Sequence, residues 1–208
     1  MKYVIIGGSA AGIAAATEIR KLDRKGELTI ICKDDFYYSR CQLHMVASGA
    51  TSVEQVRLKP AGWAEGLGIK FMSGKTVSGL DAAAKKITLD DEQIIHYDRL
   101  LIATGARTFF PPLEGISGPL TFGLRNLDDA LAINESRKTA KCFTIIGAGL
   151  VGVELAAALV KTGVNVNLVE LAQHPLPLQL DQVCGAKCSK MLAGAGVKLY
   201  FGTPAKTL

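Results

Sequence analysis

The stretch Lys141–Glu170 constrains the fold more than any other part of the chain. A short apolar run leads into Gly147, Gly149 and Gly152, a helix of small and apolar residues follows, and a second apolar run ends at Glu170. A strand, a glycine turn, a helix and a strand with a terminal acid, in this order, are typical of a dinucleotide-binding βαβ unit. A glycine triplet alone would also fit other α/β proteins, but the complete order favours a nucleotide site.

The residues of this turn match what a bound pyrophosphate needs. Gly147 permits the tight bend after the strand, Gly149 leaves room for the phosphates, and Gly152 lets the helix pack close to the strand. The helix begins at Leu150, followed by Val151. At this end, backbone N–H groups and the positive end of the helix dipole attract phosphate.

Glu170 stands where the second strand of the unit ends. A carboxylate at this position can accept hydrogen bonds from a ribose 2′-hydroxyl and repels a 2′-phosphate. No arginine follows it in residues 171–174. The sequence therefore favours NAD over NADP.

The N-terminus carries a second copy of this pattern. Residues 2–6 form an apolar run, residues 7–12 a glycine-rich turn, residues 10–22 a helical pattern and residues 28–32 a second apolar run. The two glycine turns lie about 140 residues apart. Such a repetition is more specific than either turn alone and predicts two nucleotide sites.

The N-terminal copy departs from the pattern at two positions. Ser9 occupies the place of the second glycine, where its hydroxyl could itself contact a phosphate. Cys32 occupies the place of the ribose-binding acid. Asp34 or Asp35 could take over that contact, or could simply be solvated loop acids.

The segment between the two copies predicts further strands. Residues 69–72, 75–80, 86–89 and 93–97 are short runs separated by turn residues, which predicts a small antiparallel meander. A buried strand at 99–103 ends in Thr104-Gly105, a close backbone approach suited to a cofactor. The Pro- and Gly-rich residues 111–119 form the best linker. We expect domains at 1–115 and 116–208, both with a Rossmann-like, three-layer α/β fold around a parallel sheet.

The region after the linker predicts three more elements around the central stretch. A helix should begin near 124–130 and end at about 137, with two acids near its start. Asp181 is expected to cap a helix that extends to about residue 193, and residues 197–201 should form a strand.

Composition excludes several classes of protein. The net charge is +5, but lysines and arginines are scattered, so we expect no nucleic-acid partner. No apolar run approaches the roughly 20 residues of a membrane span, and Met1 leads directly into a strand, so neither a membrane segment nor a signal peptide is expected. Five cysteines, an odd number, suggest reduced thiols in the cytoplasm. Cys184 and Cys188 lie one helical turn apart without another ligand nearby, so no metal site is expected.

The ordered motifs at 7–12, 97–107, 124–130 and 147–154, with Glu170, resemble the flavin-containing pyridine nucleotide-disulfide oxidoreductase family, the flavoproteins with two dinucleotide-binding domains. The resemblance covers essentially the whole chain and implies that the first site binds FAD and the second NAD(P)H. It also places Glu154 near the nicotinamide. The implied FAD contacts are Gly7, Ser9, Ala10, Ala11, Gly12, Cys32, Lys33, Arg40, Val77, Ala103, Thr104, Gly105 and Arg107. The implied NAD contacts are Gly147, Gly149, Leu150, Val151, Gly152 and Glu170.

Cys41 is the candidate redox thiol. The chain lacks the Cys-x4-Cys pair of glutathione-reductase-like members. Residues 37–49 resemble the branch of NADH oxidases and CoA-disulfide reductases, which has a single redox cysteine. They also resemble the branch of nitrite reductase large subunits and rubredoxin or ferredoxin reductases, in which an Arg-Pro pair stands at Arg40-Cys41 and a lysine where Met45 falls. Cys41 is thus either a thiolate activated by Arg40, His44 or the following helix, or a spectator in the place of proline.

The resemblance implies an oxidoreductase in which NADH reduces FAD and the electrons pass to a disulfide, oxygen or a redox protein. It also implies a longer protein, a homodimer, in which a later segment completes the FAD domain and an interface domain follows. We therefore expect the chain to be truncated. The alternatives are a nucleotide-binding or structural module without turnover, and a non-redox nucleotide sensor.

Overall fold

The computed structural model describes residues 1–207, which form two compact units. The first unit comprises Met1–Ser39 and Val56–Ala106, and the second comprises Arg40–Gln55 together with the chain from Arg107 onward. The segment Arg40–Gln55 packs within the second unit, which no feature of the sequence indicates. The assignment of residues 1–115 and 116–208 to two cofactor domains stays a prediction.

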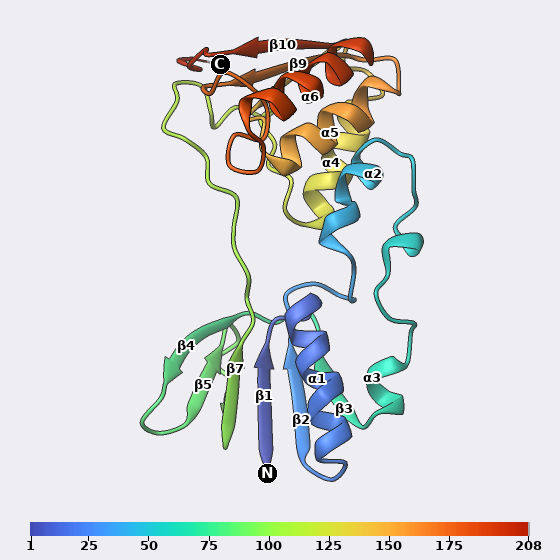
Figure 1. Cartoon of the computed structure of the whole chain (residues 1–208). Coiled ribbons are helices and arrows are strands. Elements are labelled where there is room, and N and C mark those ends of the chain that lie inside the picture. The colour runs from blue at the N-terminus through green and yellow to red at the C-terminus, as the bar shows by residue number, and fades with distance from the viewer. Residues whose placement is uncertain (208) are drawn as a thin grey trace. The chain divides into compact units, whose positions relative to one another are not determined.

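A four-stranded parallel sheet forms the centre of the first unit, in the order β3-β2-β1-β7 (Figure 1). Its strands are rich in β-branched and aliphatic residues, which fit the pleated surface of a sheet. The strand expected to be buried at 99–103 is largely exposed, including Leu101 and Ile102. They comprise β1 (Lys2–Ile6), β2 (Glu27–Ile31), β3 (Ile69–Met72) and β7 (Arg99–Ile102).

Helix α1 (Ala10–Leu22) covers one face of this sheet. Alternate residues of β1 and β2 meet the apolar side of the helix, because successive side chains of a strand point to opposite faces. This core contains Ile5, Ile13, Ala16, Leu28 and Ile30.

An antiparallel meander covers the other face of the sheet. It consists of β4 (Val77–Asp81), β5 (Lys86–Leu89) and β6 (Ile94–His96), and its core contains Val4, Ile31, Ile87, Leu89 and Tyr97. The sequence prediction of this meander was wrong in one respect, because β3 does not belong to it. β3 pairs in parallel with β2, with Leu28 opposite Ile69. A four-residue apolar run carries no information about the direction of its partner, so only the tertiary contacts decide it.

Four short helical segments lie between β2 and β3. They comprise η1 (Arg40–Gln42), α2 (Leu43–Ala47), η2 (Glu54–Val56) and α3 (Trp63–Gly66). α2 is the helix that the sequence suggested directly after Cys41.

The second unit is built on a three-stranded parallel sheet in the order β10-β9-β8. Figure 1 labels β9 and β10 of this sheet. Val166 and Leu168 of β9 are buried, whereas Asn165, the first residue of this strand, is exposed. Helices α5 and α6 pack against these strands and bury Leu159 and Leu192. The elements comprise α4 (Leu127–Ser136), β8 (Cys142–Ile146), α5 (Leu150–Val160), β9 (Asn165–Glu170), α6 (Gln182–Gly194) and β10 (Val197–Phe201). The predicted cap of α6 is confirmed, because the Asp181 carboxylate accepts the N–H of Cys184 at 2.8 Å.

A capping box fixes the start of α4. The side-chain oxygen of Asn126 accepts the N–H of Asp129 at 2.9 Å, and the Asp129 carboxylate accepts the N–H of Asn126 at 3.0 Å. Two backbone donors that a helix leaves without intrahelical partners are satisfied in this way.

Replacing Asn126 by Ala should lower the free energy of unfolding by about 1 kcal/mol, because the N-terminal donor loses its acceptor. Urea denaturation followed by circular dichroism measures this change. Asn126→Ser keeps an acceptor oxygen and should retain most of the stability. An equal loss in both variants would contradict the role of the cap.

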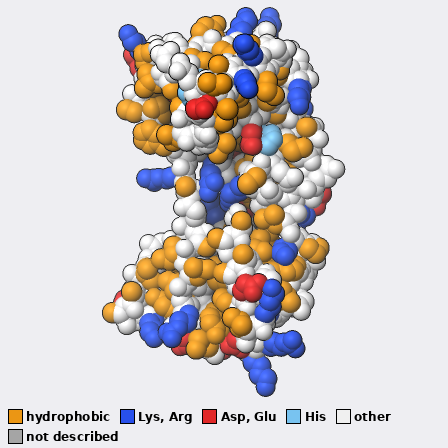
Figure 2. Space-filling model, in the orientation of Figure 1, with side chains coloured by type: hydrophobic (Ala, Val, Ile, Leu, Met, Phe, Trp, Pro, Cys, Tyr) orange, Lys and Arg blue, Asp and Glu red, His pale blue; other side chains and the backbone are white. Residues whose placement is uncertain are grey.

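The surface mixes charged, polar and apolar side chains. In Figure 2, lysines and arginines are spread among hydrophobic and acidic side chains over the drawn face of each unit. Within residues 1–207, no helix combines the length and the apolar character needed to cross a bilayer.

Candidate dinucleotide sites

The turn between β8 and α5 has the geometry of a phosphate-binding loop. Gly147 adopts a φ of 99°, and its N–H donates to the carbonyl oxygen of Val169 at 2.8 Å. A Cβ at Gly152 would collide with the carbonyl oxygen of Gly147, so only glycine lets the helix pack this close to the turn. The turn and the first residues of α5 are therefore held together as one piece.

Space remains open above Gly149. A Cβ built on Gly149 meets no protein atom within 4 Å. The next two residues, Leu150 and Val151, expose 56% and 52% of their surface although both are apolar. The start of α5 thus offers a helix N-terminus and free volume at the place where a pyrophosphate would lie.

Glu170 points back to this turn. One carboxylate oxygen accepts the N–H of Ala148 at 2.8 Å, and the other accepts the N–H of Ala172 at 3.0 Å. A carboxylate has about four acceptor positions, so both oxygens can accept further hydrogen bonds. The half-buried side chain is thereby positioned to meet ribose hydroxyls beside the turn.

The first unit repeats this construction at the start of α1. The N–H of Gly7 donates to the carbonyl oxygen of Ile31 at 2.8 Å, the counterpart of the bond from Gly147. A Cβ at Gly12 would collide with the carbonyl oxygen of Gly7, as at Gly152. Ser9 is the N-cap residue, and its hydroxyl caps no N–H of the helix.

The end of β7 lies beside the first turn. The N–H of Ala103 donates to the carbonyl oxygen of Ile6 at 2.8 Å, and a Cβ at Gly7 would collide with the carbonyl oxygen of Ala103. Thr104 and Gly105 follow on the surface, as do Ala10 and Ala11 at the start of α1. The structure therefore brings together most of the residues expected at the FAD site.

Cys32 does not lie on the surface of that turn. Its side chain is 6% exposed and packs under Gly8, where an added Cβ would come within 2.9 Å of the sulfur. The neighbouring Tyr37 is also buried, and this burial raises the pKa of its phenol. Lys33 is exposed, and Val77 at the start of β4 packs against the core on the meander side.

Besides the expected NAD contacts, the second unit contains four other predicted site residues, namely Arg40, Cys41, Arg107 and Glu154. Arg40 Nη1 donates to the carbonyl oxygen of Arg125 at 2.8 Å, and Cys41 and Arg107 are exposed. Glu154, one turn inside α5, lies with its Oε2 3.4 Å from Nδ1 of His44. The sequence did not indicate this contact, because 110 positions separate the two residues and no periodicity connects them.

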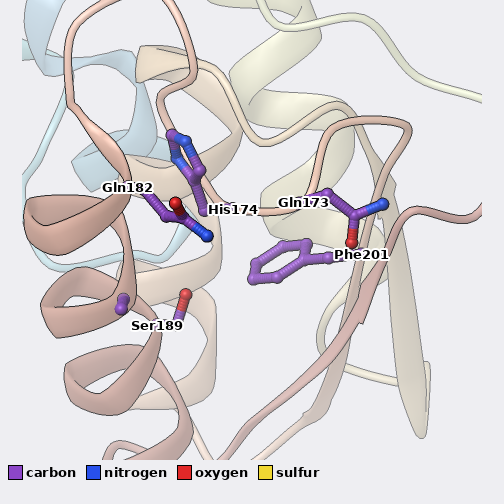
Figure 3. Close-up of a pocket in the computed structure, with 6 residues that line it drawn as sticks. Gln173, His174, Gln182, Ser189 and Phe201 are labelled. Atoms are coloured by element: carbon purple, nitrogen blue, oxygen red, sulfur yellow. The ribbon is translucent and has the colours of Figure 1, made fainter.

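The sequence also gave no sign of a pocket between α6 and β10. It has a volume of about 680 Å³ and is lined by Gln173, His174, Gln182, Ala186, Ser189 and Phe201 (Figure 3). Its polar side chains come from the loop after β9 and from α6, which follows that loop in the chain. Among the residues that the structure describes, no group of three or more His, Cys, Asp and Glu side chains is arranged to hold a metal ion.

Two glycine turns with the same hydrogen bonds, each at the end of a parallel strand in its own unit, define a protein with two dinucleotide-binding motifs. The chain belongs to the pyridine nucleotide-disulphide oxidoreductase family, whose sequence model matches residues 1–208. This confirms the family resemblance and the α/β fold class predicted from the motifs.

Three relatives illustrate this membership. A rubredoxin-NAD(+) reductase of Alcanivorax borkumensis is 34% identical over 207 residues, which cover 99% of this chain and 54% of the relative. An NADH oxidase of Methanocaldococcus jannaschii is 32% identical over 213 residues, covering 98% of this chain and 48% of the relative. The structure of a water-forming NADH oxidase from Lactobacillus brevis bound to NADH matches with a TM-score of 0.92 and 25% identity, covering 100% of this chain and 48% of that chain. The chain thus spans about half the length of these relatives.

Proposed function

We propose that this chain forms the nucleotide-binding part of an FAD-dependent NADH oxidoreductase. The observation that carries the proposal is the repeated glycine turn, with an equivalent hydrogen bond from Gly7 and from Gly147 and an equivalent close helix contact at Gly12 and Gly152. The first turn would hold FAD and the second NADH, an order that follows the family resemblance.

The residues at the second turn fit NADH. Gly149 leaves volume for the pyrophosphate, the first N–H groups of α5 face it, and Glu170 would accept the ribose hydroxyls and repel a 2′-phosphate. When bound, the nicotinamide and flavin rings supply the hydride and electron chemistry. The protein holds and orients them, and Glu154 would lie on the nicotinamide side of α5.

The first turn fits the phosphates of FAD. Ser9 lies at the N-terminus of α1, and its hydroxyl does not cap the helix. Thr104 and Gly105 are exposed and follow the end of β7 beside this turn. The ribose contact expected at Cys32 would have to come from its backbone or from a neighbour, because the thiol is buried.

The electron acceptor would be a disulfide reached through Cys41, oxygen, or a redox protein. The exposed thiol of Cys41 supports the first route, and the rubredoxin named for the Alcanivorax relative supports the last. A cytoplasmic location, supported by the odd number of five cysteines, and a homodimer of the longer protein belong to the same proposal.

The second candidate function is a nucleotide-binding module without turnover. The observation that favours it is the coverage, because the chain spans only 54% of the Alcanivorax relative and 48% of the Methanocaldococcus relative.

The visible absorbance spectrum of the purified chain, recorded before and after anaerobic NADH, tests the proposal. We expect a flavin spectrum that bleaches on addition of NADH, because both nucleotides would bind to one chain. A new long-wavelength thiolate–flavin band would assign the redox role to Cys41. A colourless protein that cannot be reconstituted with FAD would contradict the proposal for this chain and favour the module without turnover.

A further inference from the structure

The pocket between α6 and β10 is lined by side chains that neither proposed nucleotide site uses. Gln173 and His174 come from the loop after β9, and Gln182 and Ser189 come from α6. Phe201, the last residue of β10, points its ring towards the two α6 side chains (Figure 3). The volume of about 680 Å³ lies in the range of small-molecule sites. The pocket is therefore large enough to hold a small ligand.

Two glycines fix the loop side of the pocket. A Cβ at Gly202 would come within 2.7 Å of Nε2 of Gln173, and a Cβ at Gly185 would collide with Nδ1 of His174. Both side chains thus lie where only a glycine leaves room for them. The loop backbone is held as well, because the N–H of Gly202 donates to the carbonyl oxygen of Ala172 at 2.9 Å. This wall is part of the fold and needs no ligand to form.

The polar groups of the pocket keep capacity for further hydrogen bonds. Within residues 1–207, no protein group bonds to the side-chain amides of Gln173 and Gln182. Nδ1 of His174 lies 3.0 Å from the carbonyl oxygen of Pro175, and Oγ of Ser189 donates to a backbone carbonyl one turn earlier at 2.9 Å. A carbonyl oxygen only accepts, so the neutral imidazole carries its proton on Nδ1 and leaves Nε2 as an acceptor. The pocket therefore offers two amides that both donate and accept, together with two acceptors.

The lining of the pocket contains no permanent charge. None of the six lining residues is a lysine, arginine, aspartate or glutamate. A carboxylate or phosphate that entered the pocket would lose hydration without meeting a cation, which is unfavourable. The lining therefore favours an uncharged ligand.

The Phe201 ring and the glutamine amides together favour a flat ligand. Aromatic rings attract one another in offset-stacked or edge-to-face arrangements. A glutamine amide can form two parallel hydrogen bonds with the edge of a planar heterocycle, as it does with a base edge. Gln182 and Ser189 provide such polar groups on the side to which the Phe201 ring points.

We propose that this pocket binds an uncharged planar heterocycle with an amide or imide edge, of the pyrimidine-base type. The edge of the ligand pairs with the glutamine amides, and its ring lies against Phe201. The site involves neither glycine turn, so this proposal does not rest on the proposed function.

Uracil is the probe for this site. Titration of the nitrogen-15-labelled chain with uracil, followed by proton–nitrogen correlation NMR, reports on the side-chain amides of Gln173 and Gln182. We expect both signals to shift and to saturate with a dissociation constant of about 1 mM or lower, the scale of a ligand with few atoms.

Two relatives of uracil test the chemistry of the ligand. Dihydrouracil keeps the imide but lacks the flat unsaturated ring, and it should bind about threefold more weakly because stacking is lost. Orotate adds a carboxylate and should bind at least about tenfold more weakly, because no cation lines the pocket. Equal binding of the three compounds would contradict the proposed class of ligand.

Variants of α6 and of its preceding loop locate the binding. Ala186→Phe fills the pocket from an exposed position and should abolish the uracil-dependent shifts, whereas Ala193→Phe, exposed on the same helix but outside the lining, should bind as the wild type does. Gln182→Leu should weaken binding about tenfold through the loss of the paired hydrogen bonds. Gln179→Leu is its matched control, because Gln179 is an exposed glutamine nearby that does not line the pocket.

Two results would overturn the site. One is the absence of any shift of the Gln173 and Gln182 amide signals at millimolar uracil, and the other is an unchanged shift of these signals in Ala186→Phe. The assay contains neither flavin nor NADH, so its outcome is distinct from the absorbance test of the proposed function.

Discussion

Gly149→Val is expected to abolish NADH binding while the second unit stays folded. Gly149 has a φ of −75°, which any residue adopts, and the volume in front of it contains no protein atom within 4 Å. A valine side chain would occupy the volume needed by the pyrophosphate. Losing one or two charge-assisted hydrogen bonds corresponds to an affinity about 100-fold weaker or more. Quenching or enhancement of NADH fluorescence measures the affinity, and circular dichroism measures the fold.

Gly194→Ala is the matched control for this substitution. Gly194 ends α6, and a Cβ there also meets no atom within 4 Å, but it lies far along the chain from the glycine turn. The control should leave the NADH affinity unchanged and should stabilise the helix slightly. If Gly149→Val binds NADH as tightly as Gly194→Ala, the dinucleotide does not bind at this turn.

The second large effect is expected at Gly7, where the backbone and the packing both require glycine. Gly7 has a φ of 116°, and a Cβ would collide with the carbonyl oxygen of Ala103. Gly7→Ala would force β7 away from β1. The two strands are also joined just beyond the end of β7, where the N–H of Ala103 donates to the carbonyl oxygen of Ile6. We expect the free energy of unfolding to fall by about 2–4 kcal/mol, the sum of backbone strain and overpacking. Urea denaturation measures this loss.

Gly66→Ala provides the comparison within the same unit. Gly66 lies in α3, has no positive φ and leaves its Cβ position without neighbours within 4 Å. The alanine should be neutral or stabilise the unit by up to about 1 kcal/mol. If Gly66→Ala lowers the free energy of unfolding as much as Gly7→Ala, the collision with Ala103 is not the cause of the loss at Gly7.

The parts of the fold that depend on local rules could be predicted from the sequence. The glycines at 7, 12, 147 and 152 have one structural role each, and the order of strand, turn and helix around them leaves little choice. The cap at Asp181 follows from the same kind of rule, because an N-cap side chain bonds only to residues within its own first turn. These features need no knowledge of the rest of the chain.

The parts that depend on packing between distant segments could not be predicted. β3 pairs with β2, and the paired residues, such as Leu28 and Ile69, are 41 positions apart. The docking of Arg40–Gln55 on α4 includes a hydrogen bond from Asn134 to the backbone oxygen of Val46, and such a contact leaves no pattern in the sequence. His44 and Glu154 are recognisable as neighbours only once α2 and α5 have been placed.

The fixed position of Glu170 affects the entropy of nucleotide binding at the second turn. Its carboxylate is already immobilised by the N–H groups of Ala148 and Ala172 before any ligand arrives. If a nucleotide binds at this turn, ordering the Glu170 side chain would therefore cost little conformational entropy. Loosening that carboxylate would weaken binding through disorder in the free protein, without removing a single contact from the complex.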